Sequence, residues 1–258
     1  MVDTRNRNSN VSARPRLVRT VIAIAGLLAL AAACGWLAAW QLRRAAESRD
    51  VSARFAAAAE APALDAAPDA LTEGLRFQRV ALRGRYVAEP QVLLDGRVHD
   101  DAAGYEVLTA LELADDRNVL VDRGWIRADP DRRVLPDVSV DGDEREVLGR
   151  LERLPRAGLK LGASRIGAPA DGPVIVALYP TAADIGRWLH SPVQDYVLLL
   201  DADANDGYVR DWQAPVMSPE RHLAYAGQWL LFGLGSIAAA IAVARAGRAS
   251  RTPEEPAA

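Results

Sequence analysis

The sequence predicts an α+β membrane protein in which two transmembrane helices flank one antiparallel, β-rich extracytoplasmic domain. Two apolar runs, 21–42 and 223–244, contain no Asp, Glu, Lys or Arg. Each is about 20 residues long, which is enough to cross a bilayer. The chain between them consists largely of short β-type runs separated by turn residues, which is typical of an antiparallel sheet.

The distribution of charge predicts the orientation. Five arginines precede the first apolar run against one acid, Asp3, and three arginines follow the second against two glutamates. Basic residues favour the cytoplasmic side, so we expect segments 1–20 and 245–258 to be cytoplasmic. The rest of the chain holds 23 of the 31 basic and 31 of the 34 acidic residues, a net charge of −8. Segment 43–222 is therefore predicted to form the periplasmic domain of a multi-pass protein of the cell inner membrane.

The N-terminal run also permits a different interpretation. Three alanines precede Cys34, as in a cleaved signal peptide or a bacterial lipoprotein site. Apolar residues continue to Trp40, which gives the run full spanning length with aromatic residues at its outer end. A retained anchor is favoured. Cys34 is also the single cysteine, so we expect the domain to be stabilised by its core without disulfides.

The elements of the domain follow in order. Helix-forming residues at 41–59 predict that the first span continues out of the membrane as a helix, and 56–69 is Ala- and Pro-rich like a linker. Asp95-Gly96, Asp115-Asp116 and Asp206-Gly207 predict hairpin turns. One helix is expected at 181–189, capped by Thr181. The predicted strands are 77–87, 91–94, 105–113, 118–126, 146–151, 174–178, 196–200 and 208–212.

Four short motifs in this order resemble the surfeit-locus protein 1 family. They are Trp-Gln-Leu-Arg-Arg at 40–44, Gly-Tyr with a following Thr at 104–109, an Arg-Gly-Trp signature within 119–126, and His-Leu-Ala-Tyr-Ala-Gly-Gln-Trp at 222–229. The resemblance implies an assembly factor for cytochrome c oxidase that aids haem a insertion into subunit I or stabilises that subunit. The implied partners are subunit I and the haem a synthesis or insertion factors, beside the lipid bilayer.

A transient haem a site is predicted around His222, which lies just before the second span. Imidazole is a common axial ligand of haem iron. Tyr225 and Trp229 follow at helical spacing, and Arg43 and Arg44 lie at a similar membrane depth, where they could pair with propionates. The alternative stays open that His222, Tyr225 and Trp229 only occupy the membrane interface, which suits all three residue types.

Candidate partner-binding residues lie at the end of the first span and in the Arg-Gly-Trp motif. Trp40 and Gln41 could contact a partner, although Trp40 is also typical of an interfacial aromatic belt. Gln41 and Gln228 lie toward corresponding ends of the two spans and are available for an interhelical hydrogen bond or for a partner. Arg123, Gly124 and Trp125 at a strand end predict either a binding surface or a structural corner.

The chemistry that is missing from the sequence excludes several classes of function. It has no cysteine pair, no His and acid cluster for zinc, no phosphate-binding glycine loop and no serine elbow. We therefore expect no enzyme activity, no catalytic residue, no metal other than haem iron at His222 and no nucleic acid partner. The rival functions are a membrane-anchored envelope binding or sensor module unrelated to respiration, and an envelope enzyme.

Overall fold

The computed structural model describes residues 9–155, 172–205 and 208–249. The chain forms two compact units. The first contains the two terminal helices, up to Ala53 and from Pro215 onward, and the second runs from Arg54 to Ala214.

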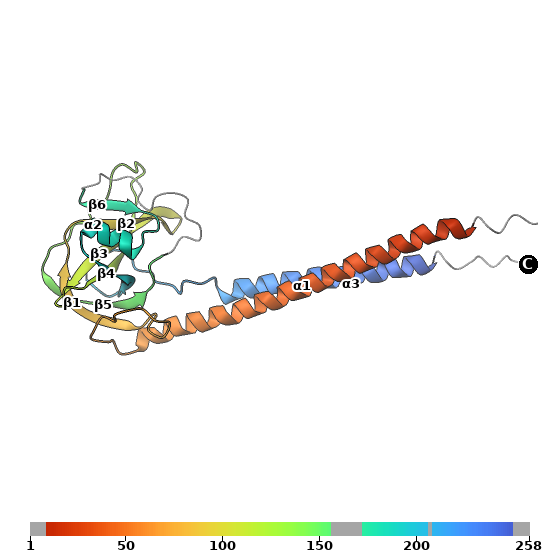
Figure 1. The fold of residues 1–258 in the computed structure, drawn as a ribbon, viewed down its shortest axis with the longest axis horizontal. Coiled ribbons are helices and arrows are strands. Elements are labelled where there is room, and N and C mark those ends of the chain that lie inside the picture. The colour runs from red at the N-terminus through yellow and green to blue at the C-terminus, as the bar shows by residue number, and fades with distance from the viewer. Residues whose placement is uncertain (1–8, 156–171, 206–207, 250–258) are drawn as a thin grey trace, which may run out of the picture. The chain divides into compact units, whose positions relative to one another are not determined.

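The first unit is an antiparallel pair of helices, α1 (Ser9–Glu60) and α3 (Pro219–Ala249) (Figure 1). Both are long and apolar enough to cross a membrane, because the charge-free runs lie within them. The contacts show the antiparallel direction: a Cβ atom on Gly247 would lie 3.3 Å from the Thr20 side chain, and one on Gly233 would lie 3.4 Å from Cys34 Cβ. The predicted membrane protein with two flanking helices is confirmed.

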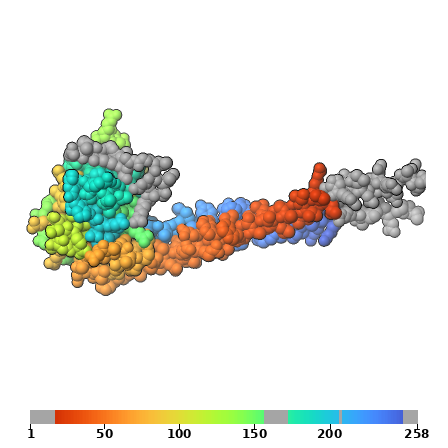
Figure 2. Space-filling model, viewed as in Figure 1, coloured from red at the N-terminus to blue at the C-terminus, as the bar shows by residue number. Residues whose placement is uncertain are grey.

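The two helices meet along one row of small residues on each, which we call the seam. On α1 the most buried seam positions are spaced alternately by four and three residues, and the same spacing recurs on α3. This repeat keeps one face of each helix toward its neighbour, as in a coiled coil. Small side chains let the backbones approach closely, and Figure 2 shows the helices in contact along their length. The buried seam residues are Cys34, Ala38, Gln41, Ala45 and Ser48 on α1 and His222, Ala226, Gly233, Ser236 and Ala240 on α3.

The second unit is built on a seven-stranded mixed sheet with the order β1-β5-β7-β4-β3-β2-β6. Because β1 also pairs with β3, the five strands β1, β5, β7, β4 and β3 close into a ring. Five of the described pairings are antiparallel, while β4–β7 and β2–β6 are parallel. The strands are β1 (Arg79–Tyr86), β2 (Gln91–His99), β3 (Ala102–Leu113), β4 (Asn118–Arg127), β5 (Glu144–Glu152), β6 (Val174–Ala177) and β7 (Val193–Leu200).

Side chains of the ring strands contribute to three hydrophobic clusters, the two larger of which lie on opposite faces of the strands. One core gathers side chains from all five ring strands, including Leu82, Leu111 and Leu198, so it fills the interior of the ring. The opposite faces of β3, β4 and β7 are covered by α2 (Ala182–Leu189), whose Ile185 is fully buried. The Thr181 side chain accepts a hydrogen bond from the Asp184 amide at the start of α2, which confirms the expected cap.

Two expected features of the sheet differ from the prediction, and a third cannot be compared. Asp95-Gly96 is not a hairpin turn but an irregularity within β2, where the register shifts between Leu94 and Arg97. The chain turns instead at Asp100 and Asp101, which both have positive φ, as a two-residue hairpin requires. The expected strand at 208–212 is only an isolated bridge between Val209 and Trp125. The expected turn at 206–207 lies outside the described residues.

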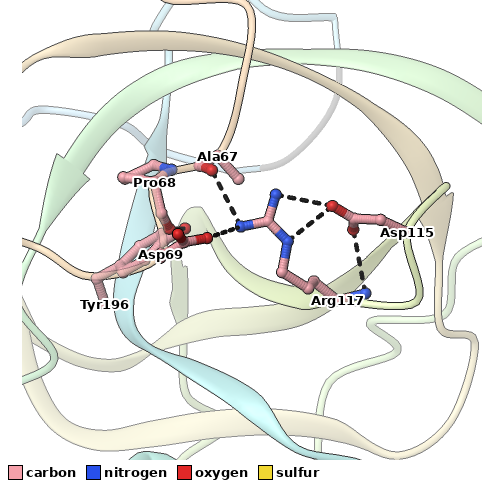
Figure 3. A network of polar contacts seen from close by, with 6 residues as sticks. All are labelled: Ala67, Pro68, Asp69, Asp115, Arg117 and Tyr196. Carbon is pink, nitrogen blue, oxygen red and sulfur yellow. Dashed lines mark hydrogen bonds and ion pairs between the residues drawn. The ribbon is translucent and has the colours of Figure 1, made fainter.

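Arg117, in the turn between β3 and β4, binds the segment that precedes β1 (Figure 3). Its guanidinium donates to Ala67 O at 3.1 Å and pairs with Asp69 at 3.0 Å and Asp115 at 2.8 Å. Tyr196 Oη donates to Pro68 O at 2.8 Å, and burial raises the pKa of Tyr196 to about 12. The phenol therefore stays a donor at physiological pH, and the segment leading into β1 is held by both residues.

Candidate functional site

The candidate haem residue, His222, is bonded to Gln41 across the seam. His222 Nδ1 lies 2.8 Å from Gln41 Oε1, although 181 residues separate them in the sequence. Both are buried, at 8% and 9% exposure. With the amide oxygen of Gln41 as the acceptor, Nδ1 is the donor of this hydrogen bond, and the neutral ring in that tautomer has its lone pair on Nε2. This is how a neighbouring acceptor fixes the tautomer of a metal-binding histidine.

The other predicted haem residues surround this pair without bonding to it. Trp229 is half-buried on the seam face of α3, with its ring 5.9 Å from that of Phe232. Tyr225 is 46% exposed on another side of the helix. Arg43 is exposed, and Arg44 is held by Glu47 at 2.6 Å. The tautomer of His222 therefore fits an iron ligand, but its ring is enclosed by the two helices, so haem access requires the seam to open at this level.

The exposed aromatic residues near the end of the first span do not join the seam. Trp36 and Trp40 are 63% and 40% exposed on α1, where they are available to lipid or to a partner protein. Gln41 is turned inward instead and is engaged by His222. Of the two residues predicted together for partner contact, only Trp40 is therefore at the surface.

The Arg-Gly-Trp motif forms a corner at the end of β4, most of which is buried. Arg123 is 5% exposed, and its guanidinium lies over the rings of Tyr86 at 5.7 Å and Tyr208 at 5.2 Å. It also donates to Val138 O at 3.2 Å. Arg123 thus contacts β1, the segment before β5 and the segment after β7. Arg123, predicted for partner contact, is therefore a buried residue of the corner.

Gly124 and Trp125 complete the corner. Gly124 has a φ of +118°, and a Cβ there would lie 2.7 Å from Val209 O, so no other residue fits. Trp125 is half-buried; its indole donates to Arg97 O at 3.5 Å and its ring lies 5.2 Å from that of His99. Trp125 is therefore the member of the motif that reaches the surface.

A buried polar cluster beside this corner was not predicted. Asp122 is 3% exposed and accepts from the Gly124 amide at 3.1 Å. Burial and the nearby Glu106 raise the pKa of Asp122 well above its usual range. Burial also raises the pKa of Glu106, although Arg97 at 3.0 Å opposes this. The only signal in the sequence was a single acid inside the apolar run 119–126.

No group of three or more His, Cys, Asp or Glu side chains that could hold a metal ion occurs among the described residues. The buried Thr109 hydroxyl bonds the Gln91 side chain, which in turn donates to Val87 O and Ala88 O. Thr109, the last residue of the second motif, therefore anchors the turn between β1 and β2.

Comparison with known proteins matches the model of the SURF1 family to residues 28–234. A SURF1-like protein of Rickettsia conorii (strain ATCC VR-613 / Malish 7) is 26% identical over 112 residues, which is 43% of this chain and 45% of the relative. A SURF1-like protein of Dictyostelium discoideum is 39% identical over 54 residues, 21% of this chain and 20% of the relative. The chain thus spans less than half the length of each of these relatives.

Proposed function

Because the chain belongs to the SURF1 family, we propose that it is an assembly factor for cytochrome c oxidase in the cell inner membrane. The observation that carries this proposal is the extent of the family match, which includes most of the first apolar run, the whole domain and half of the second run. In the proposed orientation both termini are cytoplasmic and the domain is periplasmic. Its action is binding, with subunit I and haem a factors as the partners.

At the level of the site, we propose that the Gln41–His222 pair handles haem a as cargo. The support is the hydrogen bond between Nδ1 and Gln41, which leaves the lone pair of His222 Nε2 free to bind iron. Haem would supply its iron, and the chain would supply Nε2 of His222 as one nitrogen ligand. Arg43 is exposed two residues after Gln41, on the opposite side of α1, so a propionate would have to reach around the helix to pair with its guanidinium. Arg44 would first have to release Glu47 before its guanidinium could pair with a propionate.

Trp40 and Trp125 are the proposed contacts for the protein partner. Both present part of an indole at the surface of their units, and tryptophan is frequent among residues that dominate interfaces. Gln41, Arg123 and Gly124 support them from the interior, the first through the seam and the others through the corner.

The assembly role is tested in membranes of cells that lack this protein and contain no second copy of its gene. We expect the reduced-minus-oxidised absorption of haem a and the rate of cytochrome c oxidation to fall together, and the wild-type gene to restore both. Unchanged oxidase would contradict the assembly role and favour the envelope module instead.

The haem role is tested separately by titrating haem a into the purified full chain. His222→Ala should abolish the spectral change of axial ligation, and Gln41→Leu should weaken binding about 10- to 100-fold, since it removes the group that orients the ligand. His190→Ala, a histidine outside the helix pair, is the control and should bind normally. If His222→Ala binds haem as the wild type does yet fails in assembly, the protein acts as a scaffold for subunit I.

A further inference from the structure

The edge of β1 that faces away from β5 is covered along most of its length, with a gap in the middle. Backbone groups of successive residues in a strand point to alternate sides. Ala81 N donates to Leu64 O at 2.8 Å and Leu64 N donates to Arg79 O at 2.9 Å, so the odd-numbered residues of β1 face this edge. Leu64 thus covers the start of the edge, and β3 covers its end from Gly84 onward.

Two backbone groups of β1 face this gap, the carbonyl of Ala81 and the amide of Arg83. No hydrogen bond joins either of them to a residue that the structure describes. In the parallel ladder that Leu64 begins, the next residue to pair would be Ala66, but the chain bends at Asp65 and Ala66 and leaves the edge. One acceptor and one donor therefore remain at the position that the next residue of a paired strand would fill.

The gap opens into a cleft of about 570 Å³, which we call the β1 cleft. Its floor is apolar, because Leu82 and Leu113 belong to the core that fills the ring and are only 3% and 9% exposed. Small side chains form its walls, namely those of Ala66, Ala67, Ala81 and Ala114. The cleft therefore offers apolar surface and open space beside the two backbone groups.

The charged side chains at the rim largely neutralise one another. Arg83 pairs with Glu146 at 3.1 Å on one side, and Arg117 pairs with Asp115 at 2.8 Å on the other (Figure 3). The hydrogen bond from Arg117 lowers the pKa of Asp115, so this pair stays charged at neutral pH. Asp65 is the remaining charged residue of the lining. Because both guanidinium groups already have a carboxylate, the rim has no free cation for an anionic ligand, and the neutral backbone groups decide what fits.

We propose that the β1 cleft binds an extended segment of a partner polypeptide, one residue of which takes the position between Ala81 and Arg83. Its N–H would donate to Ala81 O and its carbonyl would accept from the Arg83 amide, as Leu64 does one position earlier with Ala81 and Arg79. This residue would lie opposite Leu82, and directly opposed residues in a sheet point their side chains to the same face. Its side chain would therefore enter the apolar floor, so we expect an apolar residue between two polar ones.

The proposal is tested by titrating a peptide into the full chain in nanodiscs, with ¹³C-labelled alanine methyl groups as reporters. The probe is acetyl-Thr-Leu-Thr-amide. The methyl signals of Ala66 and Ala114 report on the cleft, and that of Ala183, exposed on α2, is the reference. We expect shifts at the first two that saturate in the millimolar range, and none at the reference. The same peptide with a methyl group on the leucine nitrogen cannot donate to Ala81 O and should bind about 3- to 10-fold more weakly.

Two variants of Arg83 form a matched pair. Arg83→Pro removes the free amide without removing a backbone hydrogen bond of the described fold, and Leu82 before it already has the extended backbone that proline requires. It should weaken binding of the peptide about 3- to 10-fold. Arg83→Ala loses only the exposed pair with Glu146 and keeps the amide, so it should bind as the wild type does. Ala66→Leu, which narrows the cleft without touching β1, should abolish binding even if the proline variant is unstable.

Three results would overturn the proposal. Absent or unsaturable shifts at Ala66 and Ala114, or equal shifts at Ala183, would show that the cleft binds no peptide. Equal binding of the N-methyl peptide, or by Arg83→Pro, would show that the peptide does not continue the ladder. Tighter binding of a peptide with lysine in place of leucine would contradict an apolar floor. The titration contains neither oxidase nor haem, so its failure would leave the assembly role untouched, and the reverse.

Discussion

Asp122, which is buried, and Glu106, which is half-buried, are two carboxyl groups that share one nearby guanidinium, that of Arg97. Burial disfavours the charged form of a carboxyl, and a second carboxyl nearby disfavours it further. Because both shifts are upward, the folded pair retains a proton at pH values where the unfolded chain has released it. The pair adjoins the Arg-Gly-Trp corner, since Asp122 also accepts from the Gly124 amide.

This pair predicts a loss of stability with rising pH. A carboxyl with a raised folded pKa contributes stability below its unfolded pKa of about 4, and that contribution is lost as the pH rises through the folded value. Asp122→Asn mimics the protonated form at every pH. We expect it to flatten the decline and, at alkaline pH, to exceed the wild type by about 1 kcal/mol or more in free energy of unfolding.

The measurement is urea unfolding of the full chain in detergent, followed by tryptophan fluorescence across the pH range. Glu112→Gln is the control, because Glu112 lies on the same strand as Glu106 but is exposed. It should leave the pH profile unchanged. A profile for Asp122→Asn that declines as steeply as that of the wild type would show that Asp122 is not the group that holds the proton.

At the scale of the elements, the α1–α3 seam depends on the absence of side chains at its glycines. Gly233→Leu would place a large group where even a Cβ lies 3.4 Å from Cys34 and 3.6 Å from Ala31 O. Overpacking of this kind costs about 1–3 kcal/mol, so the fraction of chains with an opened seam should rise about fivefold or more. Cys34 is 2% exposed on the seam, and its thiol reports the opening directly.

The rate at which a membrane-permeant maleimide labels Cys34 measures this effect in the folded full chain. We expect the rate to rise in Gly233→Leu and to stay at the wild-type value in Gly26→Leu, because a Cβ on Gly26 meets nothing within 4 Å. Equal rates in both variants would mean that the helices do not rely on close approach at Gly233.

The elements themselves were largely predictable because their signals are local. A charge-free run long enough to span a membrane marks each terminal helix, and Thr181 with Asp184 marks the start of α2. The Asp95-Gly96 prediction failed because that dipeptide is equally suited to an irregularity within a strand, where Gly96 has a φ of +75°. The parallel pairings and the closure of β1 on β3 join strands far apart in the sequence, and no local pattern encodes them.

In the candidate site too, the single residues were predictable from the sequence, but the contacts between distant residues were not. The sequence indicated His222 and Gln41 separately, one from its place before a span and the other from its polarity. Their hydrogen bond depends on the antiparallel register of two helices 181 residues apart, which composition does not specify. In the same way, Arg123 was visible as a motif residue, but its burial between Tyr86 and Tyr208 follows from the closed ring.

The orientation of the whole molecule is the remaining consequence of its charge pattern. The terminal segments carry eight arginines against three acids, while the rest of the chain has a net charge of −8. Retention of basic flanks on the cytoplasmic side predicts that a cysteine in the domain is reached from outside the inner membrane and that one in either terminus is not. Val98 is 71% exposed on β2 and tolerates such a probe.

In the Cys34→Ala background, a membrane-impermeant maleimide should label Val98→Cys in cells whose outer membrane has been made permeable. Thr252→Cys, in the C-terminal segment, should be labelled only after the inner membrane is also opened. Thr252→Cys is the matched control for Val98→Cys, because it should stay unlabelled as long as the inner membrane is intact. The reverse pattern would place the domain in the cytoplasm and would contradict the orientation argued from the arginines.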